Sequence, residues 1–253
     1  QDNVYRPQAV TDTAGEKPAD LIILFVKALY SKAALSSNRG LIGEHTYVMT
    51  LQNGSGHEDL LSEFVPKERI IIGTTNDQGT VLGMGHIRHG GEGETNIGML
   101  VPDTEGFLPR VRDALNECGF RATIRENILQ LIWDKLFNNV SLSATTALLS
   151  CEMGELVTNE YAWRMVEQLA REAAEVAHAI GLQADVEAIL QKIKKTCELS
   201  PHGITSICAD IRAGRKTEVA TISGSVVRAA KKAGISAPTH EFVVAQIHAL
   251  EHR

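Results

Sequence analysis

The stretch Leu21–Val26 reads L-I-I-L-F-V and is followed by Lys27. A continuous hydrophobic run of this length predicts a strand buried on both faces, as in a parallel sheet covered by helices. Tyr47–Leu51 and Ile70–Gly73 repeat the pattern, and Ser31–Leu41 leaves room for a crossover helix between the first two strands. Strand, helix and strand in this order predict an α/β domain with parallel strands.

The pattern changes after the third strand. Gly79–Gly98 is rich in glycine and alternates in polarity, which predicts antiparallel strands at the edge of the sheet. Thr104 is expected to cap a helix that ends at Gly119, where a left-handed residue is expected. Beyond residue 124 hydrophobic residues recur at helical spacing almost throughout. We therefore predict an α/β domain over residues 1–124 and an all-α domain over residues 125–253.

The composition of the 253-residue chain excludes some classes of function. The formal net charge is -6, and Lys and Arg do not cluster, so a nucleic-acid surface is not expected. The longest hydrophobic run is far shorter than the ~20 residues that cross a membrane. No signal peptide is recognised at the polar start. The sequence predicts a cytoplasmic protein that binds neither membrane nor nucleic acid, and a few local cations would still suit an acidic small molecule.

Lys135 and Asn139 are the first pair of candidate functional residues. They are four positions apart on a predicted helix and so share one face, which Ser143 extends by one more turn. An ammonium and an amide projected together into a cleft could protonate and orient a carbonyl oxygen. The alternative from spacing alone is a solvated lysine and a surface or capping asparagine.

A second group of candidates follows the Pro201–Gly203 break. Ser206 and Asp210 are one helical turn apart, and Thr217-Glu218 is predicted to begin the next helix, where the helix dipole favours a carboxylate. The alternative is that Glu218 is only a residue of that first turn.

The residues that follow the predicted strands are the third group. Asn53-Gly54 comes directly after one strand and Lys27 ends another, and the carboxyl ends of such strands are where ligands bind in open α/β sheets. A simple turn is the alternative for Asn53-Gly54, and a solubilising cap is the alternative for Lys27.

Read in order, these segments resemble the ketopantoate reductase family. The resemblance is carried by five motifs of that family: the D-hydrophobics-K-A strand (Asp20–Ala28), the L-Q-N-G turn (Leu51–Gly54), the W-x-K-L-x-x-N helix (Trp133–Asn139), the S-x-x-x-D-I then T-E segment (Ser206–Gly224) and the closing G-I-x-x-P (Gly234–Pro238). Their order and spacing agree along the whole chain.

The resemblance implies a Rossmann-like cofactor domain followed by an all-α substrate and catalytic domain. It also implies NADPH-dependent reduction of a 2-oxo acid to a 2-hydroxy acid, most simply 2-dehydropantoate to pantoate in pantothenate biosynthesis, without a metal. By the resemblance, Lys135 is the general acid and Glu218 pairs with it or orients it. The resemblance also implies substrate contacts from Asn139, Ser143, Ser206 and Asp210. It implies cofactor contacts from Lys27, Asn53 and Gly54.

Three departures from the family pattern keep alternatives open. The G-x-G-x-x-G turn with which the family begins is not found, and the first strand here resembles a later one, so the first strands of the cofactor domain are expected to be missing. Ser143 and Met153 stand where the family has asparagines. They favour, as an alternative, a D-2-hydroxyacid dehydrogenase acting on a more apolar branched 2-oxo acid. The missing turn motivates another alternative, a non-catalytic remnant, and the helical domain offers surfaces for a homodimer.

Overall fold

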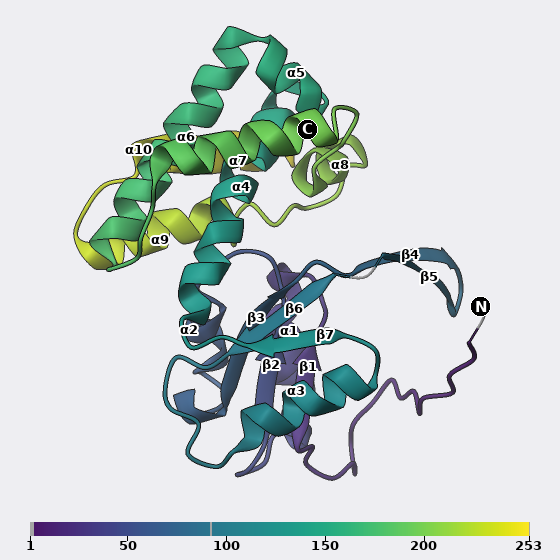
Figure 1. Cartoon of the computed structure of the whole chain (residues 1–253). Coiled ribbons are helices and arrows are strands. Elements are labelled where there is room, and N and C mark those ends of the chain that lie inside the picture. Colours follow the sequence, from purple (N-terminus) through teal and green to yellow (C-terminus); the bar gives the residue numbers. More distant parts are fainter. Residues whose placement is uncertain (1–2, 92, 253) are drawn as a thin grey trace.

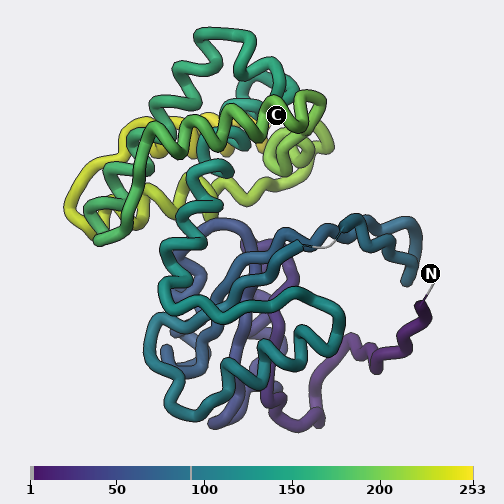
Figure 2. Tube along the Cα trace, in the orientation of Figure 1, coloured from purple at the N-terminus to yellow at the C-terminus, as the bar shows by residue number. Residues whose placement is uncertain are grey.

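The computed structural model describes residues 3–91 and 93–252 of the chain. An α/β domain and a helical domain lie one above the other, joined by the long helix α4 (Figures 1 and 2). This arrangement confirms the predicted fold class.

The two domains are built from elements of different kinds. The α/β domain consists of β1 (Leu21–Leu24), η1 (Ala28–Tyr30), α1 (Ser31–Ser37), η2 (Arg39–Leu41), β2 (Tyr47–Thr50), α2 (His57–Leu61), η3 (Lys67–Arg69), β3 (Ile70–Thr75), β4 (Gln78–Gly83), β5 (His86–Gly91), β6 (Glu94–Gly98), α3 (Phe107–Glu117) and β7 (Arg121–Ile124). The helices that follow are α4 (Ile128–Leu149), α5 (Met153–Thr158), α6 (Glu160–Ala179), α7 (Val186–Leu199), α8 (Ser206–Arg212), α9 (Ser223–Ala233) and α10 (Pro238–Leu250).

The main sheet has the strand order β1-β2-β3-β6-β7. β1, β2 and β3 are parallel, β6 is antiparallel to β3, and β7 is parallel to β6. Successive side chains of a strand point to opposite faces, so Val48 and Ile72 join one hydrophobic cluster and Met49 and Ile71 join the other. Helix α3 covers the second face, whereas the first face is covered partly by the start of α4.

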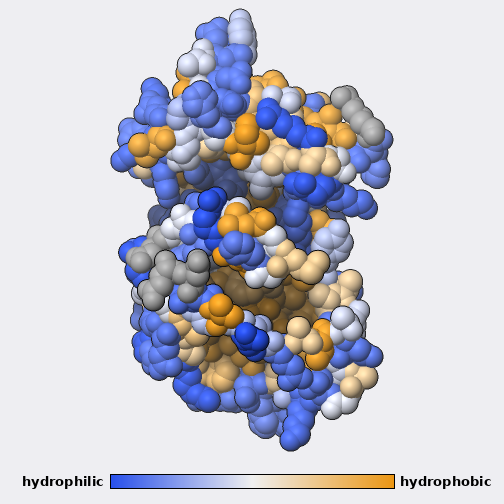
Figure 3. All heavy atoms as spheres, turned by 90° about the vertical axis from the view of Figure 1, so that its right-hand side faces the viewer, coloured by the Kyte–Doolittle hydropathy of each residue, from blue (hydrophilic) through white to orange (hydrophobic). Residues whose placement is uncertain are grey.

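The prediction that the first strand is buried on both faces is wrong. Among the described strands, β1 lies at the edge of the sheet and pairs only with β2. Without a neighbour on its other side, Ile23 is 38% exposed, and Phe25 just beyond the strand is 67% exposed. Hydrophobic side chains surround a hollow in the α/β half of one face of the molecule (Figure 3).

The glycine-rich segment also differs from the prediction. β4 and β5 form a separate two-stranded sheet that projects from the domain, and all of their described side chains are exposed (Figure 1). No other described element pairs with them. β6, in contrast, lies inside the main sheet between β3 and β7, and its residues Thr95–Gly98 are therefore buried.

The cap of α3 is a further difference. Gly106, with φ +66°, is the N-cap residue, and the Asp103 carboxylate accepts from the backbone N–H groups of Phe107 and Leu108. Asp103 therefore caps the start of this helix, the role that was predicted for Thr104. The predicted left-handed glycine after this helix is confirmed at Gly119, with φ +90°.

Helix α4 belongs to the cores of both domains. Ile128 and Ile132 pack against the sheet, whereas Val140 and Ala144 lie in the helical core with residues of α6 and α9. Thirteen of its 22 residues are buried, because neighbouring elements surround the helix along most of its length.

A buried carboxylate fastens the start of α10. Glu172 of α6 is 5% exposed and accepts from the backbone N–H groups of Thr239 and His240 and from His240 Nδ1, at 2.8–2.9 Å. Burial opposes its charged form, but these hydrogen bonds outweigh burial and lower the pKa of Glu172 from 4.5 to about 2. Glu172 thus replaces the side-chain cap that α10 lacks.

The two domains also meet through the turn after β2. Gly54 has φ +102°, and a Cβ atom there would lie 2.1 Å from the carbonyl oxygen of Thr221. The Ser55 N–H donates to that same oxygen at 3.3 Å. Next to this contact, Asp59 of α2 forms an ion pair with Lys232 of α9. Only glycine allows the turn to lie so close to the helical domain.

Replacing Glu172 by Gln is expected to destabilise the fold at neutral pH. A pKa lowered from 4.5 to about 2 corresponds to roughly 3 kcal/mol of stabilisation. Because the folded pKa is depressed, this stabilisation is present above about pH 4.5 and is lost as the pH falls towards 2. Urea unfolding from pH 3 to 7 should show that the free energy of unfolding of the wild type exceeds that of Glu172→Gln, and that this difference shrinks at acid pH. Glu175→Gln, at an exposed site on the same helix, serves as the control.

Replacing Gly54 by Ala is expected to lower the free energy of unfolding by roughly 1–3 kcal/mol, because the new methyl group overlaps the Thr221 carbonyl. Chemical denaturation measures the loss. Gly40→Ala is the matched control, since a Cβ atom at Gly40 meets nothing within 4 Å. Equal stability of the two variants would contradict a tight contact at Gly54.

Candidate active site

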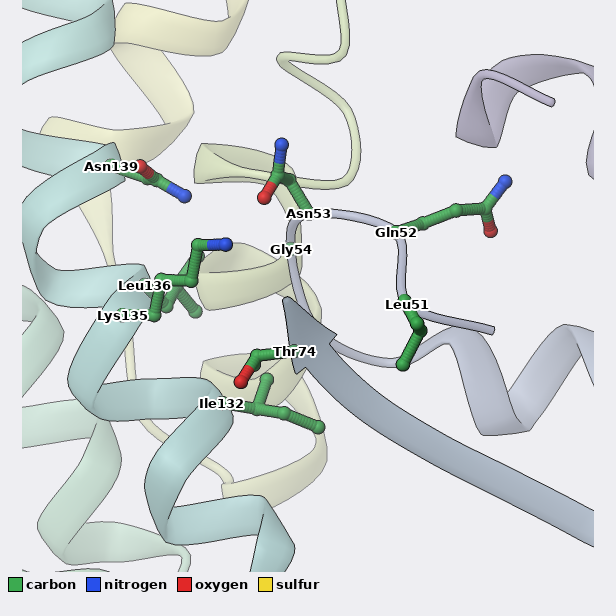
Figure 4. A pocket seen from close by; sticks show the side chains of 9 residues that line it. All are labelled: Leu51, Gln52, Asn53, Gly54, Thr74, Ile132, Lys135, Leu136 and Asn139. Atoms are coloured by element: carbon green, nitrogen blue, oxygen red, sulfur yellow. The ribbon is translucent and has the colours of Figure 1, made fainter. Parts of the chain in front are cut away.

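A small cavity lies where α4 passes the carboxyl ends of β2 and β3. Its volume of about 10 Å³ is room for roughly one water molecule. Both domains contribute to its wall (Figure 4), which is formed by Leu51, Gln52, Asn53, Gly54, Thr74, Ile132, Lys135, Leu136 and Asn139. We call it the Lys135 cavity.

Lys135 and Asn139 come together as the helical spacing predicts. Both line the cavity from α4, and in Figure 4 the Lys135 amine extends toward the Asn53 turn while the Asn139 amide turns toward the same space. Lys135 Nζ donates to the carbonyl oxygen of Thr75 at 2.7 Å. Burial lowers the pKa of Lys135, since removal from water disfavours the charged amine.

The Asn53 turn is held rigidly at the cavity. The His57 ring bonds the carbonyl oxygen of Asn53 at 3.0 Å through Nε2. Burial lowers the pKa of His57, so a neutral ring donates this bond. The Gln52 side chain points away from the cavity (Figure 4) and bonds Ser31 and Thr50. The Asn53 side chain is therefore presented to Lys135 by a fixed backbone.

Glu218 occupies a different place from the predicted one. Helix α9 begins only at Ser223, so Glu218 lies in the preceding turn and not at a helix start. Its Oε1 accepts from the backbone N–H of Ala28 at 2.9 Å. Within residues 3–91 and 93–252, Lys135 has no carboxylate within 4.0 Å, so the direct pairing of Lys135 with Glu218 is not seen.

Asp210 and Lys27 form an ion pair between the domains. Lys27 Nζ lies 2.6 Å from Asp210 Oδ2, and Arg215 Nε lies 2.9 Å from Asp210 Oδ1. The Asp210 side chain is only 8% exposed. Its two oxygens are thus bound to cations of this chain, and together with the Glu218–Ala28 bond they tie the end of β1 to the helical domain.

Like Lys27, Asp210 and Glu218, the predicted residues Ser206 and Ser143 do not line the Lys135 cavity. Ser206 is an exposed residue at the start of α8, and Ser143 is buried on α4 one turn beyond Asn139. Thr74 and Thr75, in contrast, were missed. They end β3, and the rule that drew attention to Asn53 after β2 applies equally to them.

The ammonium of Lys135 and the amide groups of Asn53 and Asn139 surround a space that one small group can enter. An ammonium and amides in a partly dry site bind an oxygen atom that carries, or acquires, negative charge. A lysine with a lowered pKa can also release its proton to such an oxygen. The geometry therefore suits protonation of a carbonyl oxygen.

None of the helices in the described part of the chain is both long and apolar enough to span a membrane. Over the same residues, no cluster of three or more His, Cys, Asp or Glu side chains could hold a metal ion.

Comparison with known proteins identifies relatives along nearly the whole chain. Residues 1–102 match the family model "Ketopantoate reductase PanE/ApbA", and residues 127–251 match "Ketopantoate reductase PanE/ApbA C terminal". A 2-dehydropantoate 2-reductase of Streptococcus pyogenes serotype M3 is 34% identical over 94% of this chain and 78% of its own. That of Halobacterium salinarum is 30% identical over 93% of this chain and 77% of its own.

Solved structures agree with this assignment. A ternary structure of D-mandelate dehydrogenase with NADH and anilino(oxo)acetate superposes with a TM-score of 0.84 at 32% identity, over 94% of this chain and 77% of that one. A putative 2-dehydropantoate 2-reductase of Enterococcus faecalis gives a TM-score of 0.79 at 29% identity, over 94% and 77% of the two chains. The resemblance of the five motifs is confirmed, and the chain belongs to the ketopantoate reductase family of oxidoreductases.

Proposed function

We propose that this protein reduces a 2-oxo acid to a 2-hydroxy acid with NADPH, most simply 2-dehydropantoate to pantoate. The observation that carries the proposal is the position of Lys135, half-buried between Asn53 and Asn139 at the carboxyl edge of the parallel strands. The 2-dehydropantoate 2-reductases among the relatives support the same reaction.

Lys135 acts as the general acid in this proposal. A reduced nicotinamide, when bound, would supply the hydride for the carbonyl carbon. The Lys135 ammonium transfers a proton to the carbonyl oxygen, and its pKa, lowered by burial, eases this transfer. Asn139 and Asn53 orient the oxygen by hydrogen bonds from their amide groups, which cost no reorganisation because their backbones are fixed.

The residues at the carboxyl ends of β1 and β2 fit a dinucleotide only in part. Asn53, Gly54 and Lys27 lie at the carboxyl ends of β1 and β2, where such ligands bind. The following helix, α2, has Glu58 and Asp59 in its first turn, and these carboxylates disfavour a diphosphate. Gly54-Ser55-Gly56 leads into α2, but the third glycine of the G-x-G-x-x-G pattern is replaced by Asp59, and no complete pattern of this kind occurs among the described residues.

Admission of ligands requires the two domains to separate. The Lys135 cavity has room for roughly one water molecule, far less than a nicotinamide ring needs. The Lys27–Asp210 ion pair and the Glu218–Ala28 bond join the domains beside the cavity. We propose that Glu218 and Asp210 contribute to catalysis by holding the end of β1 against the helical domain, and that Lys27 contacts the nicotinamide side.

Further substrate contacts come from residues beyond the cavity in this proposal. Ser206 and Ser143 can contribute hydroxyl groups once the domains separate, because both lie on helices that border the interface, α8 and α4. A homodimer that uses the helical domain is proposed as the oligomeric form.

A more apolar 2-oxo acid is the second candidate substrate. Ser143 and Met153 provide fewer hydrogen bonds than the asparagines that the family pattern has at these positions. Met153 packs in a hydrophobic cluster, and its methyl group lies against Gly203. The similarity to a D-mandelate dehydrogenase, whose structure holds anilino(oxo)acetate, supports this candidate. A substrate site with fewer hydrogen-bonding partners at these positions would favour a hydroxylated substrate less strongly.

Replacing Lys135 by Met is expected to lower turnover of the preferred 2-oxo acid by about 10²–10⁴-fold, because the general acid is lost. The assay follows oxidation of NADPH, and separately of NADH, with 2-dehydropantoate and with phenylglyoxylate. Because Lys135 must be protonated, wild-type turnover should fall as the pH rises through its lowered pKa.

Lys32→Met is the control, since Lys32 pairs with Glu63 at an exposed site. Full activity of Lys135→Met would exclude the assigned mechanism. Faster turnover of phenylglyoxylate than of 2-dehydropantoate would favour the second candidate substrate.

A further inference from the structure

The bond between Lys135 and the carbonyl oxygen of Thr75 depends on how the end of β3 is held. Thr75 is the last residue of that strand, and Asn76 and Asp77 lead directly into the projecting β4–β5 hairpin. A strand end beside an exposed hairpin would be free to move unless something fixed it. The structure shows what does so.

Asp77 is the centre of a hydrogen-bond network at this point. Its Oδ2 accepts from the hydroxyl groups of Thr75 and Thr95 at 3.1 Å each, and its Oδ1 accepts from the backbone N–H of Gly93 at 3.1 Å. The two threonine hydroxyls are 2.8 Å apart. The network therefore joins the end of β3 to the start of β6 through side chains as well as through the backbone.

The surroundings of Asp77 are closely packed. Its side chain is 15% exposed, and Thr95 is fully buried. A Cβ atom on Gly93 would lie 2.3 Å from the backbone nitrogen of Asp77, so the two chain segments touch. His89 of β5 faces Asp77, with Nε2 3.3 Å from Oδ1. Arg121 of β7 lies beside the same segment, with Nε 3.4 Å from the carbonyl oxygen of Gly93.

The hydrogen bonds around Asp77 favour its charged form. Burial opposes the charged form, but the hydrogen bonds from Gly93, Thr75, Thr95 and His89 outweigh it and lower the pKa of Asp77. The carboxylate thus stays ionised at neutral pH and keeps accepting from its donors.

We propose that Asp77 is a positioning residue for Lys135: it fixes Thr75 so that the Thr75 carbonyl oxygen holds the ammonium at the cavity. The catalytic part of this inference rests on the proposed function. Asp77 acts through Thr75 and not through its own charge, because burial is what perturbs Lys135 and Asp77 is not within ion-pair distance of it.

Loss of the Thr75 contact is expected to lower the pKa of Lys135 further. A carbonyl oxygen that accepts from the ammonium stabilises the charged form in a site where burial disfavours it. If Thr75 is released, the charged form loses this support and the pKa of Lys135 falls further. The ammonium is then deprotonated at lower pH and is also less well placed for proton transfer.

The test replaces Asp77 by Asn and measures Lys135 directly. Competitive labelling with acetic anhydride, followed by mass spectrometry of the Lys135 peptide over a range of pH, gives the pKa of this amine without any substrate. We expect the Lys135 titration to move to lower pH in Asp77→Asn. In turnover assays, we expect kcat to fall about 10- to 100-fold, with little change in KM. The alkaline limb of the pH profile of kcat should also move to lower pH.

Thr95 provides a second, milder test should Asp77→Asn fail to fold. Thr95→Val removes one donor to Asp77 at constant size, whereas Thr95→Ser keeps the hydroxyl group. Thr95→Val should move the Lys135 titration to lower pH, and Thr95→Ser should leave it in place. Asp113→Asn, at the exposed Arg112 pair on α3, is the control for loss of a carboxylate.

The outcomes separate this inference from the proposed function. An unchanged Lys135 titration in both Asp77→Asn and Thr95→Val would overturn the positioning role, whatever the activity. A Lys135 titration that is shifted in these variants, together with no turnover by the wild-type protein, would support the positioning role and reject the proposed reaction. A fall in kcat without a shift of the titration would mean a general structural effect and would also overturn the inference.

Discussion

The packing of α4 against both domains is the constraint on which the rest of the structure depends. Its first turns bury Ile128 and Ile132 on the sheet, and its later turns bury Val140 and Ala144 among the other helices. Lys135 and Asn139 stand between these two buried regions, so a rigid helix carries them to the carboxyl ends of β2 and β3. A functional group on a helix anchored at both ends loses little freedom when it binds a ligand.

The interface around this helix joins elements distant in sequence. Gly54 lies against Thr221, Lys27 pairs with Asp210, and Ala28 donates to Glu218. Each of these contacts links a residue that follows a strand of the α/β domain to a turn or helix of the other domain. These contacts hold the domains together around the small cavity, and under the proposed function they loosen when a ligand enters.

Charge is distributed unevenly between the two sides of the site. Among the described residues Lys135 donates to a neutral carbonyl oxygen and pairs with no carboxylate, and burial lowers its pKa. Lys27 faces the buried carboxylate of Asp210, and Asp77 is ionised within a network of hydroxyl and N–H donors. Of these two lysines, Lys135 is the one without a carboxylate partner in the described part of the chain, which fits the general-acid role proposed for it.

The sequence by itself determined the fold class, the family and the cavity residues Lys135, Asn139 and Asn53. Helical spacing and the ends of strands are local properties, so four-residue periodicity and the place of Asn53 after β2 could be read directly. Other features depend on neighbours that no local pattern reveals. The exposure of β1, the turn around Glu218, the ion pairs of Asp210 and the hold of Asp77 on Thr75 were decided only by the tertiary structure. Burial and pairing at these positions are set by segments as far apart as 183 and 190 residues along the chain, which meet only when the chain has folded.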